Sequence, residues 1–207
     1  MFYYLEGTVT ETGLNLVVID IGGVGYGCKV TANTLSKLEI DKKARLYTYC
    51  YIREEAFDIY GFIDLSEKRC FEHLLSVSGV GPKAALSILS SATPESLALA
   101  VINDDATILT IAQGIGKKLA QRIILELKDK VDKQAGDSVR LTPRGEDGAE
   151  AQSGKDTPGS KQHDAAAALA VLGYSQSEIS MALRGVDIEA LTVVEIIRTV
   201  LKGSAKS

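Results

Sequence analysis

The first 62 residues alternate short apolar runs with turns that carry glycine or acidic residues. Val, Ile, Tyr and Thr dominate each run, which is typical of strands. The predicted strands are Tyr3–Thr10, Leu14–Ile21, Tyr26–Val30, Arg45–Ile52 and Phe57–Phe62. A short helical pattern at Ala32–Leu38 separates the third strand from the fourth. Five short strands with one small helix at this place predict an OB-fold β-barrel over residues 1–62.

The pattern changes to helical spacing after the barrel. From Leu65 to Val131, apolar residues recur at intervals of three and four, which predicts a second, all-α domain over 63–133. Residues 134–163 are rich in Gly, Ser, Asp, Glu and Pro and nearly free of large apolar side chains, so we expect a flexible linker. Three short helical patterns over 164–207 predict a small three-helix bundle, which the linker would hold apart from the other domains.

The central domain contains an internal repeat. LLSVSGVGPKAALSIL at Leu74–Leu89 resembles LTIAQGIGKKLAQRII at Leu109–Ile124, 35 residues later. Each copy reads as a helix, a glycine, an apolar residue, a glycine and a second helix. The two turns are Gly79, Val80, Gly81 and Gly114, Ile115, Gly116. The glycines let the backbone turn sharply and come close to a ligand, and the apolar residue is expected to fill the space between the helices.

Basic residues follow each glycine pair at the start of the second helix. They are Lys83 in the first copy and Lys117, Lys118 and Arg122 in the second. A helix N-terminus presents unpaired N–H groups and the positive end of the helix dipole, which together suit a phosphate. Two copies with matching cations predict phosphate binding, and the arrangement resembles the helix-hairpin-helix motif, which implies contacts with the DNA backbone. For one copy alone, an ordinary tight turn between two helices is an equally good interpretation.

Composition limits the kind of DNA contact. The chain has 23 basic and 27 acidic residues, a net charge of −4, which excludes a protein that coats DNA through bulk positive charge. Cys28, Cys50 and Cys70 are widely spaced, and His73 and His163 are isolated, so we expect no metal, no cofactor and no catalytic residue. The absence of a long apolar run or a signal-peptide pattern predicts a cytoplasmic protein without a membrane contact.

Taken together, the barrel pattern, the repeat, the linker and the last bundle resemble the RuvA family over essentially the whole chain. The segments that carry the resemblance are FYYLEGTV, REEAFDIYGF, SVSGVGPKAALSIL and GIGKKLAQRIILELKDK. The resemblance implies a non-catalytic subunit that binds four-way (Holliday) junction DNA during recombination and repair. It also implies a homotetramer, with an octamer left open, the hexameric ATPase RuvB as a partner, and the RuvC resolvase in a larger complex.

The resemblance also implies two further sites. The family's acidic pin at the junction centre maps onto Glu54 and Glu55, between the fourth and fifth strands. A solvated hairpin turn is the alternative interpretation of these glutamates. The last bundle corresponds to the RuvB-binding domain, in which Leu169, Leu172 and Tyr174 are the candidate contact residues. Alternatively, these three residues form the core of a very small domain.

Two other classes of protein remain open. One is an enzyme that carries the same DNA-binding loops. A helicase needs the pattern GxxxxGK[ST], whereas Ile111 stands at the first glycine position and Lys118 at the Ser or Thr position. A glycosylase needs an acidic residue after the hairpin, whereas the segment after Arg122 reads as a plain amphipathic helix. The other class is a peptide-binding adaptor in which the last bundle is the functional part.

Overall fold

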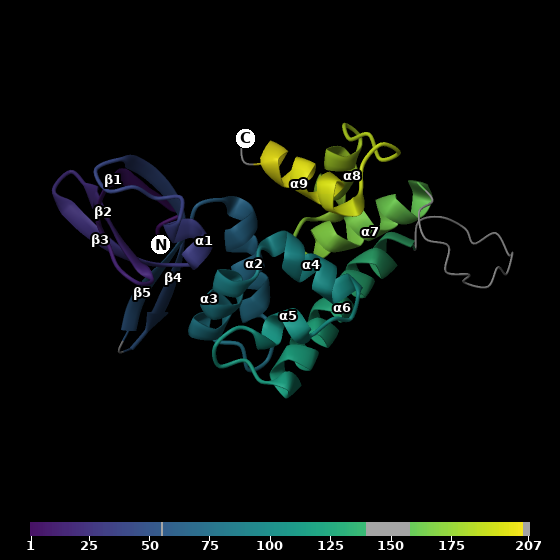
Figure 1. Cartoon of the computed structure of the whole chain (residues 1–207), viewed down its shortest axis with the longest axis horizontal. Helices are drawn as coiled ribbons and strands as arrows, with labels where there is room; N and C mark the ends of the chain where they lie inside the picture. The colour runs from purple at the N-terminus through teal and green to yellow at the C-terminus, as the bar shows by residue number, and fades with distance from the viewer. Residues whose placement is uncertain (55, 140–157, 205–207) are drawn as a thin grey trace, which may run out of the picture.

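The computed structural model describes residues 1–54, 56–139 and 158–204. A β-barrel lies at one end of the molecule and the helices at the other (Figure 1). The strands are β1 (Tyr4–Thr12), β2 (Leu16–Ile21), β3 (Val24–Val30), β4 (Lys43–Arg53) and β5 (Ala56–Phe62). They close in the order β1-β2-β3-β5-β4, with β3 and β5 parallel and the other neighbours antiparallel. The predicted five-stranded barrel is confirmed.

Alternate residues of the strands fill the barrel. Val17 and Ile19 of β2 and Cys28 and Val30 of β3 are fully buried, whereas the residues between them are partly exposed. This alternation follows from the pleat, which turns successive side chains to opposite faces of a sheet. Lys29, between two buried residues of β3, therefore points to the outside of the barrel.

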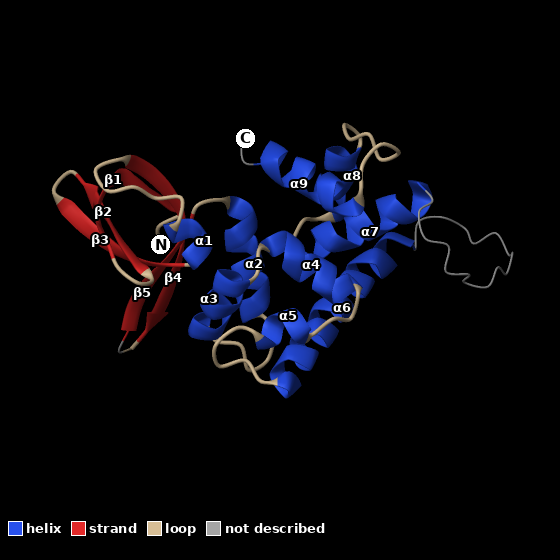
Figure 2. Cartoon of the chain, viewed as in Figure 1, coloured by secondary structure: helices blue, strands red, loops and turns tan. Residues whose placement is uncertain are grey.

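The strands β4 and β5 continue beyond the rest of the barrel. They pair with each other from Tyr47 opposite Phe62 to Arg53 opposite Ala56, whereas β1 pairs only with the first five residues of β4. The outer part is a two-stranded ribbon that projects from the barrel (Figure 2). A ribbon of this kind presents the turn at its tip to solvent.

The central domain is all-α, as predicted. Its helices are α2 (Leu65–Leu75), α3 (Pro82–Ser91), α4 (Pro94–Ile102), α5 (Thr107–Thr110) and α6 (Lys117–Val139), and the short α1 (Ala32–Leu35) belongs to the barrel. Phe71, Leu74, Leu109 and Ile123 are fully buried between the helices. Among the described residues, no single helix is long and apolar enough to cross a membrane; α3 and α4 meet that criterion only as a pair bent by 94°.

The C-terminal bundle has the three predicted helices but does not stand apart. It consists of α7 (Pro158–Val171), α8 (Gln176–Leu183) and α9 (Val193–Ser204), and α7 packs against α4 and α6 in one continuous apolar core. The buried Ala165 and Ala168 of α7 have small side chains that let neighbouring helices approach closely. The expectation of a separate unit therefore differs from the structure.

The predicted linker is also shorter at both ends. Since α6 continues to Val139 and α7 begins at Pro158, part of the range 134–163 is helical. The remaining residues of that range, 140–157, lie outside the described residues.

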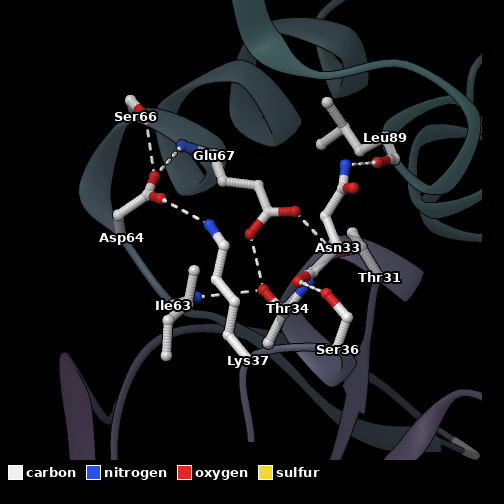
Figure 3. A network of polar contacts seen from close by, with 10 residues as sticks. All are labelled: Thr31, Asn33, Thr34, Ser36, Lys37, Ile63, Asp64, Ser66, Glu67 and Leu89. Carbon is white, nitrogen blue, oxygen red and sulfur yellow. Dashed lines mark hydrogen bonds and ion pairs between the residues drawn. The ribbon is translucent and has the colours of Figure 1, made fainter.

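A buried carboxylate joins the barrel to the helices. Glu67 of α2 is 3% exposed and accepts hydrogen bonds from the hydroxyls of Thr31 and Thr34, at 2.5 and 2.6 Å (Figure 3). The Thr34 hydroxyl in turn accepts one from the Ile63 N–H at 3.0 Å. Asp64 caps α2 by accepting from the Glu67 N–H at 2.8 Å. These bonds fix α1 and the end of β5 against the start of α2.

Candidate nucleic-acid interface

Each copy of the sequence repeat forms two helices joined by a tight turn. Gly79, between α2 and α3, has φ +87°, and Gly114, between α5 and α6, has φ +84°. Side chains disfavour this left-handed conformation, so glycine is required at both positions. Val80 and Ile115, which follow these glycines, are 6% and 5% exposed within the apolar core. The turn geometry predicted from the repeat is confirmed for both copies.

The second helix of each copy starts in open space. Gly81 is the N-cap of α3, and no side chain caps the N–H groups of that helix. Gly116 directly precedes α6, and its carbonyl accepts from the Ala120 N–H at 2.9 Å. A Cβ added at Gly81 or Gly116 would meet nothing within 4 Å. An anion can therefore reach the N–H groups and the positive dipole end of either helix.

Four exposed cations lie at or near these helix starts. They are Lys83, Lys117, Lys118 and Arg122. Within the part of the chain that the structure describes, none of the four forms an ion pair, whereas Lys128 is paired with Asp104. No ion pair with a described carboxylate engages their charge, which remains available to a ligand.

The two turns are held together as one surface. The Ser78 N–H in the first turn donates to a carboxylate oxygen of Glu126 on α6, at 3.1 Å. Arg122 comes from the second copy, yet its Nη1 lies 3.8 Å from the position that a Cβ at Gly79 would take. Phosphates bound at the two turns would therefore have a fixed spacing.

A cleft of about 480 Å³ lies between the barrel, α3 and the second turn. Its lining includes Asn15 and Lys29 from the barrel, Lys83 from α3 and Gly114 from the second turn. Lys29 was not among the predicted site residues. The strand pattern places this lysine on the outside of the barrel, but only the packing of the barrel against α3 shows which part of the outer surface faces the turns.

The predicted acidic site lies at the tip of the β4–β5 ribbon. Glu54 is exposed in the turn that follows β4, and Glu55 lies outside the described residues. In the view of Figure 1 this tip and the two helix-hairpin-helix turns lie along the same edge of the molecule.

The three candidate partner-binding residues are buried. Leu169 and Leu172 are fully buried, and Tyr174 is 4% exposed. The Arg69 guanidinium of α2 lies 4.7 Å from the centre of the Tyr174 ring and donates to Glu178 at 2.9 Å. In this arrangement the three residues belong to the core, and Tyr174 also contributes to the contact between the bundle and α2.

Cys28, Cys70 and the partly buried His73 have the properties of structural side chains. Burial raises the pKa of Cys28 to about 12 and also raises the pKa of Cys70, so both thiols stay protonated near neutral pH. Burial, with repulsion from Lys130 and Arg69, lowers the pKa of His73 and keeps its ring neutral. Among the described residues, no three His, Cys, Asp or Glu side chains are grouped so that they could hold a metal ion.

The fold and the paired turns define a tandem helix-hairpin-helix protein with an N-terminal barrel. A family model described as "SAM-like Helix-hairpin-helix tandem" matches residues 71–129. Models described as "RuvA N terminal domain" and "RuvA, C-terminal domain" match residues 1–61 and 160–205. The three matches cover the barrel, the central domain and the last bundle in the order in which the structure contains them.

Relatives match over the whole length. The chain is 44% identical to a protein of Acetivibrio thermocellus and 43% identical to one of Caldanaerobacter subterraneus subsp. tengcongensis, in each case over 100% of both chains. Both relatives carry the name "Holliday junction branch migration complex subunit RuvA". This chain belongs to the RuvA family.

Proposed function

We propose that this chain is a non-enzymatic subunit that binds four-way DNA junctions and supports their branch migration by a partner ATPase. One observation carries the proposal: two open helix starts, with exposed cations that form no ion pair within the described chain, are held in one surface. The names of the relatives, which refer to a Holliday junction branch migration complex, support the class of substrate.

Each open helix start binds one phosphate of the DNA backbone. The N–H groups give the contact its direction, and the lysine beside them supplies the charge. Such contacts hold DNA without reading its base sequence. Because the chain has a net charge of −4 and few cations at the turns, one chain alone binds weakly. Several chains therefore act together, as a homotetramer or as an octamer of two tetramers.

The C-terminal bundle is the part that recruits the ATPase, RuvB, and the RuvC resolvase joins the same assembly in the cytoplasm. Leu169, Leu172 and Tyr174 stay the candidate contact residues for RuvB. Since Arg69 of α2 covers Tyr174, contact through this ring requires the bundle to separate from α2. The shared apolar core with α4 opposes that separation.

A gel-shift experiment tests the proposed function directly. The full-length chain is titrated onto a four-way junction and onto linear duplex of the same length and composition. We expect tighter binding to the junction at every salt concentration and a steep loss of affinity as salt rises, because phosphate contacts release counterions. Equal affinity for the two DNAs would overturn the assignment of the junction as substrate.

The two glycines of the second turn are expected to respond differently to alanine. Gly114→Ala places a side chain at φ +84° and should lower the free energy of unfolding by about 1–2 kcal/mol. Gly116→Ala meets nothing within 4 Å and should leave stability unchanged, but its methyl group stands where a phosphate would approach α6. We therefore expect Gly116→Ala to weaken junction binding without a change in the unfolding midpoint. Parental binding by Gly116→Ala would show that no phosphate approaches this helix start.

Replacing Glu54 and Glu55 by glutamine should strengthen binding to linear duplex and reduce the preference for junctions. In a fourfold assembly these glutamates would gather near the centre, within about one Debye length, ~8 Å, and repel phosphates there. The measurement is the ratio of junction to duplex affinity at low and physiological salt. A variant with Glu11 and Glu39, two other exposed glutamates, replaced by glutamine has the same net charge and is the control. An unchanged ratio in the first variant would mean that the glutamates only form a solvated turn.

A further inference from the structure

The cleft between the barrel, α3 and the second turn has a lining without acidic residues. Two cations line it from different domains, Lys29 of β3 and Lys83 of α3, together with the amide of Asn15 and the backbone at Gly114. Its volume of about 480 Å³ leaves room for a backbone phosphate and its sugar, and the lining is polar enough to hydrogen-bond one. The two ammonium groups and the amide suit an anion, and the apolar side chains of Tyr60, Ala84 and Leu86 complete the lining.

Hydrogen bonds fix the walls of this cleft. The Asn33 side chain on α1 donates to the Leu89 carbonyl on α3 at 2.9 Å, which holds the barrel against α3. The Ser87 hydroxyl on α3 donates to the Gln113 carbonyl in the second turn at 3.1 Å. Lys29 and the second turn therefore have a defined relative position before any ligand binds, and little ordering is needed on binding.

Among the described residues, the ammonium of Lys29 pairs with the carboxylate of Asp58, which stands outside the cleft lining. Because β3 and β5 pair in parallel with Lys29 opposite Tyr60, Asp58 lies two residues away on the same outer face of β5. The Lys29 Nζ is 2.7 Å from Asp58 Oδ1, and the two side chains are 35% and 30% exposed. Solvent reaches both groups and screens the pair in part, and the long lysine stem can turn toward another anion without moving the strand.

We propose that the cleft holds an additional DNA phosphate, which binds Lys29, and that Asp58 tunes this contact by competing with the phosphate for the lysine. The proposal rests on the proposed function, to which it adds a contact from the barrel. Lys29 then brings the barrel to the same backbone that the helix starts bind, and the duplex runs along the cleft instead of touching the turns alone. The Asp58 carboxylate keeps the contact weak enough for DNA to move past it.

The experiment compares Lys29→Gln and Asp58→Asn in the full-length chain, by anisotropy titration of a labelled four-way junction at several salt concentrations. Lys29→Gln should weaken binding roughly tenfold. It should also make the fall of log affinity with log salt less steep, by about 0.9 for each Lys29 that contacts a phosphate. Asp58→Asn should strengthen binding by up to about fivefold, since it frees the lysine from an exposed pair.

The double variant decides whether Asp58 acts through Lys29. In the Lys29→Gln background, Asp58→Asn should no longer strengthen binding, because the lysine for which it competes is absent. An equal gain in both backgrounds would show that Asp58 is only a nearby negative charge and would overturn the competition.

Lys43→Gln is the control for loss of a lysine on the barrel, because Lys43 is exposed on β4 and does not line the cleft. If Lys29→Gln and Lys43→Gln have the same affinity and salt slope, the cleft holds no phosphate, while the proposed function stands. If the parent chain does not prefer junctions, the proposed function itself fails. Unfolding midpoints of all variants establish that each is folded during the titration.

Discussion

Replacing Lys117 and Lys118 together by glutamine is expected to weaken binding to a four-way junction about a hundredfold near 0.15 M salt. A hydrogen bond to a charged group contributes about 1.5 kcal/mol or more, so the loss of two such contacts gives about 3 kcal/mol, or about a hundredfold in Kd. Both lysines are exposed at the start of α6 and form no ion pair within the described chain. Anisotropy titration against salt measures the affinity and its salt slope.

The control for this variant is another adjacent pair of lysines. Lys42 and Lys43 are exposed at the start of β4, away from the helix starts, and their replacement by glutamine removes the same charge. We expect this control to bind almost as the parent does, because steering by net charge is a small effect compared with a lost phosphate contact. Equal losses of junction affinity in the two variants would show that Lys117 and Lys118 contribute only through the net charge of the protein. A loss confined to certain junction sequences would contradict backbone recognition.

The hairpin turns were predictable because their signals are local. The φ of Gly79 and Gly114 is required by the turn itself, and Val80 and Ile115 fill the space beside the same turn. The glycines and the apolar residue lie within a few residues of the turn that they specify. The same pattern occurs in both copies of the repeat. The strand pattern of the barrel is local in the same sense, since burial alternates along each strand.

Contacts between distant segments could not be predicted in this way. Arg69 and Glu178 form an ion pair although they are 109 residues apart. Nothing in the sequence near either residue indicates the other, and the alanines of α7 give only a weak apolar pattern for the face that packs on the central domain. Lys29 belongs to the cleft because α3 packs against the barrel at that place. Which distant residues come into contact depends on the tertiary arrangement, and the hydrophobic periodicity of the sequence does not show it.

Glu67 is a further residue whose role depends on packing, and replacing it by alanine should lower the free energy of unfolding by about 3 kcal/mol. The hydroxyls of Thr31 and Thr34 are buried and would each lose an acceptor, at a cost of about 1–3 kcal/mol per group. Glu67→Gln keeps the size of the side chain and one carbonyl oxygen, so we expect a loss of about 1 kcal/mol or less. Urea unfolding of the three proteins measures these differences, and equal stability of Glu67→Ala and Glu67→Gln would contradict the role of the hydrogen bonds.

The parent and Glu67→Gln should also differ in their response to pH. Burial raises the pKa of Glu67, although the bonds from Thr31 and Thr34 lower it in part. Because the folded-state pKa lies above the unfolded-state value of about 4.3, the folded protein binds the proton more tightly between the two values. The stability that this group contributes is therefore complete below the unfolded-state pKa and is lost as the pH rises through the folded-state pKa. Glutamine does not titrate, so the parent should lose stability relative to Glu67→Gln as the pH rises above the unfolded-state pKa and through the folded-state pKa.

A constant difference between the parent and Glu67→Gln over this range would show that burial does not control the ionisation of Glu67. The same residue bears on DNA binding, because its bonds to Thr31 and Thr34 hold α1 and therefore the barrel against the start of α2. Glu67→Ala should loosen the cleft and weaken junction binding at temperatures where the protein is still folded, whereas Glu67→Gln should bind like the parent. If Glu67→Ala stays folded and binds the junction with parental affinity, the position of the barrel does not contribute to the affinity for DNA.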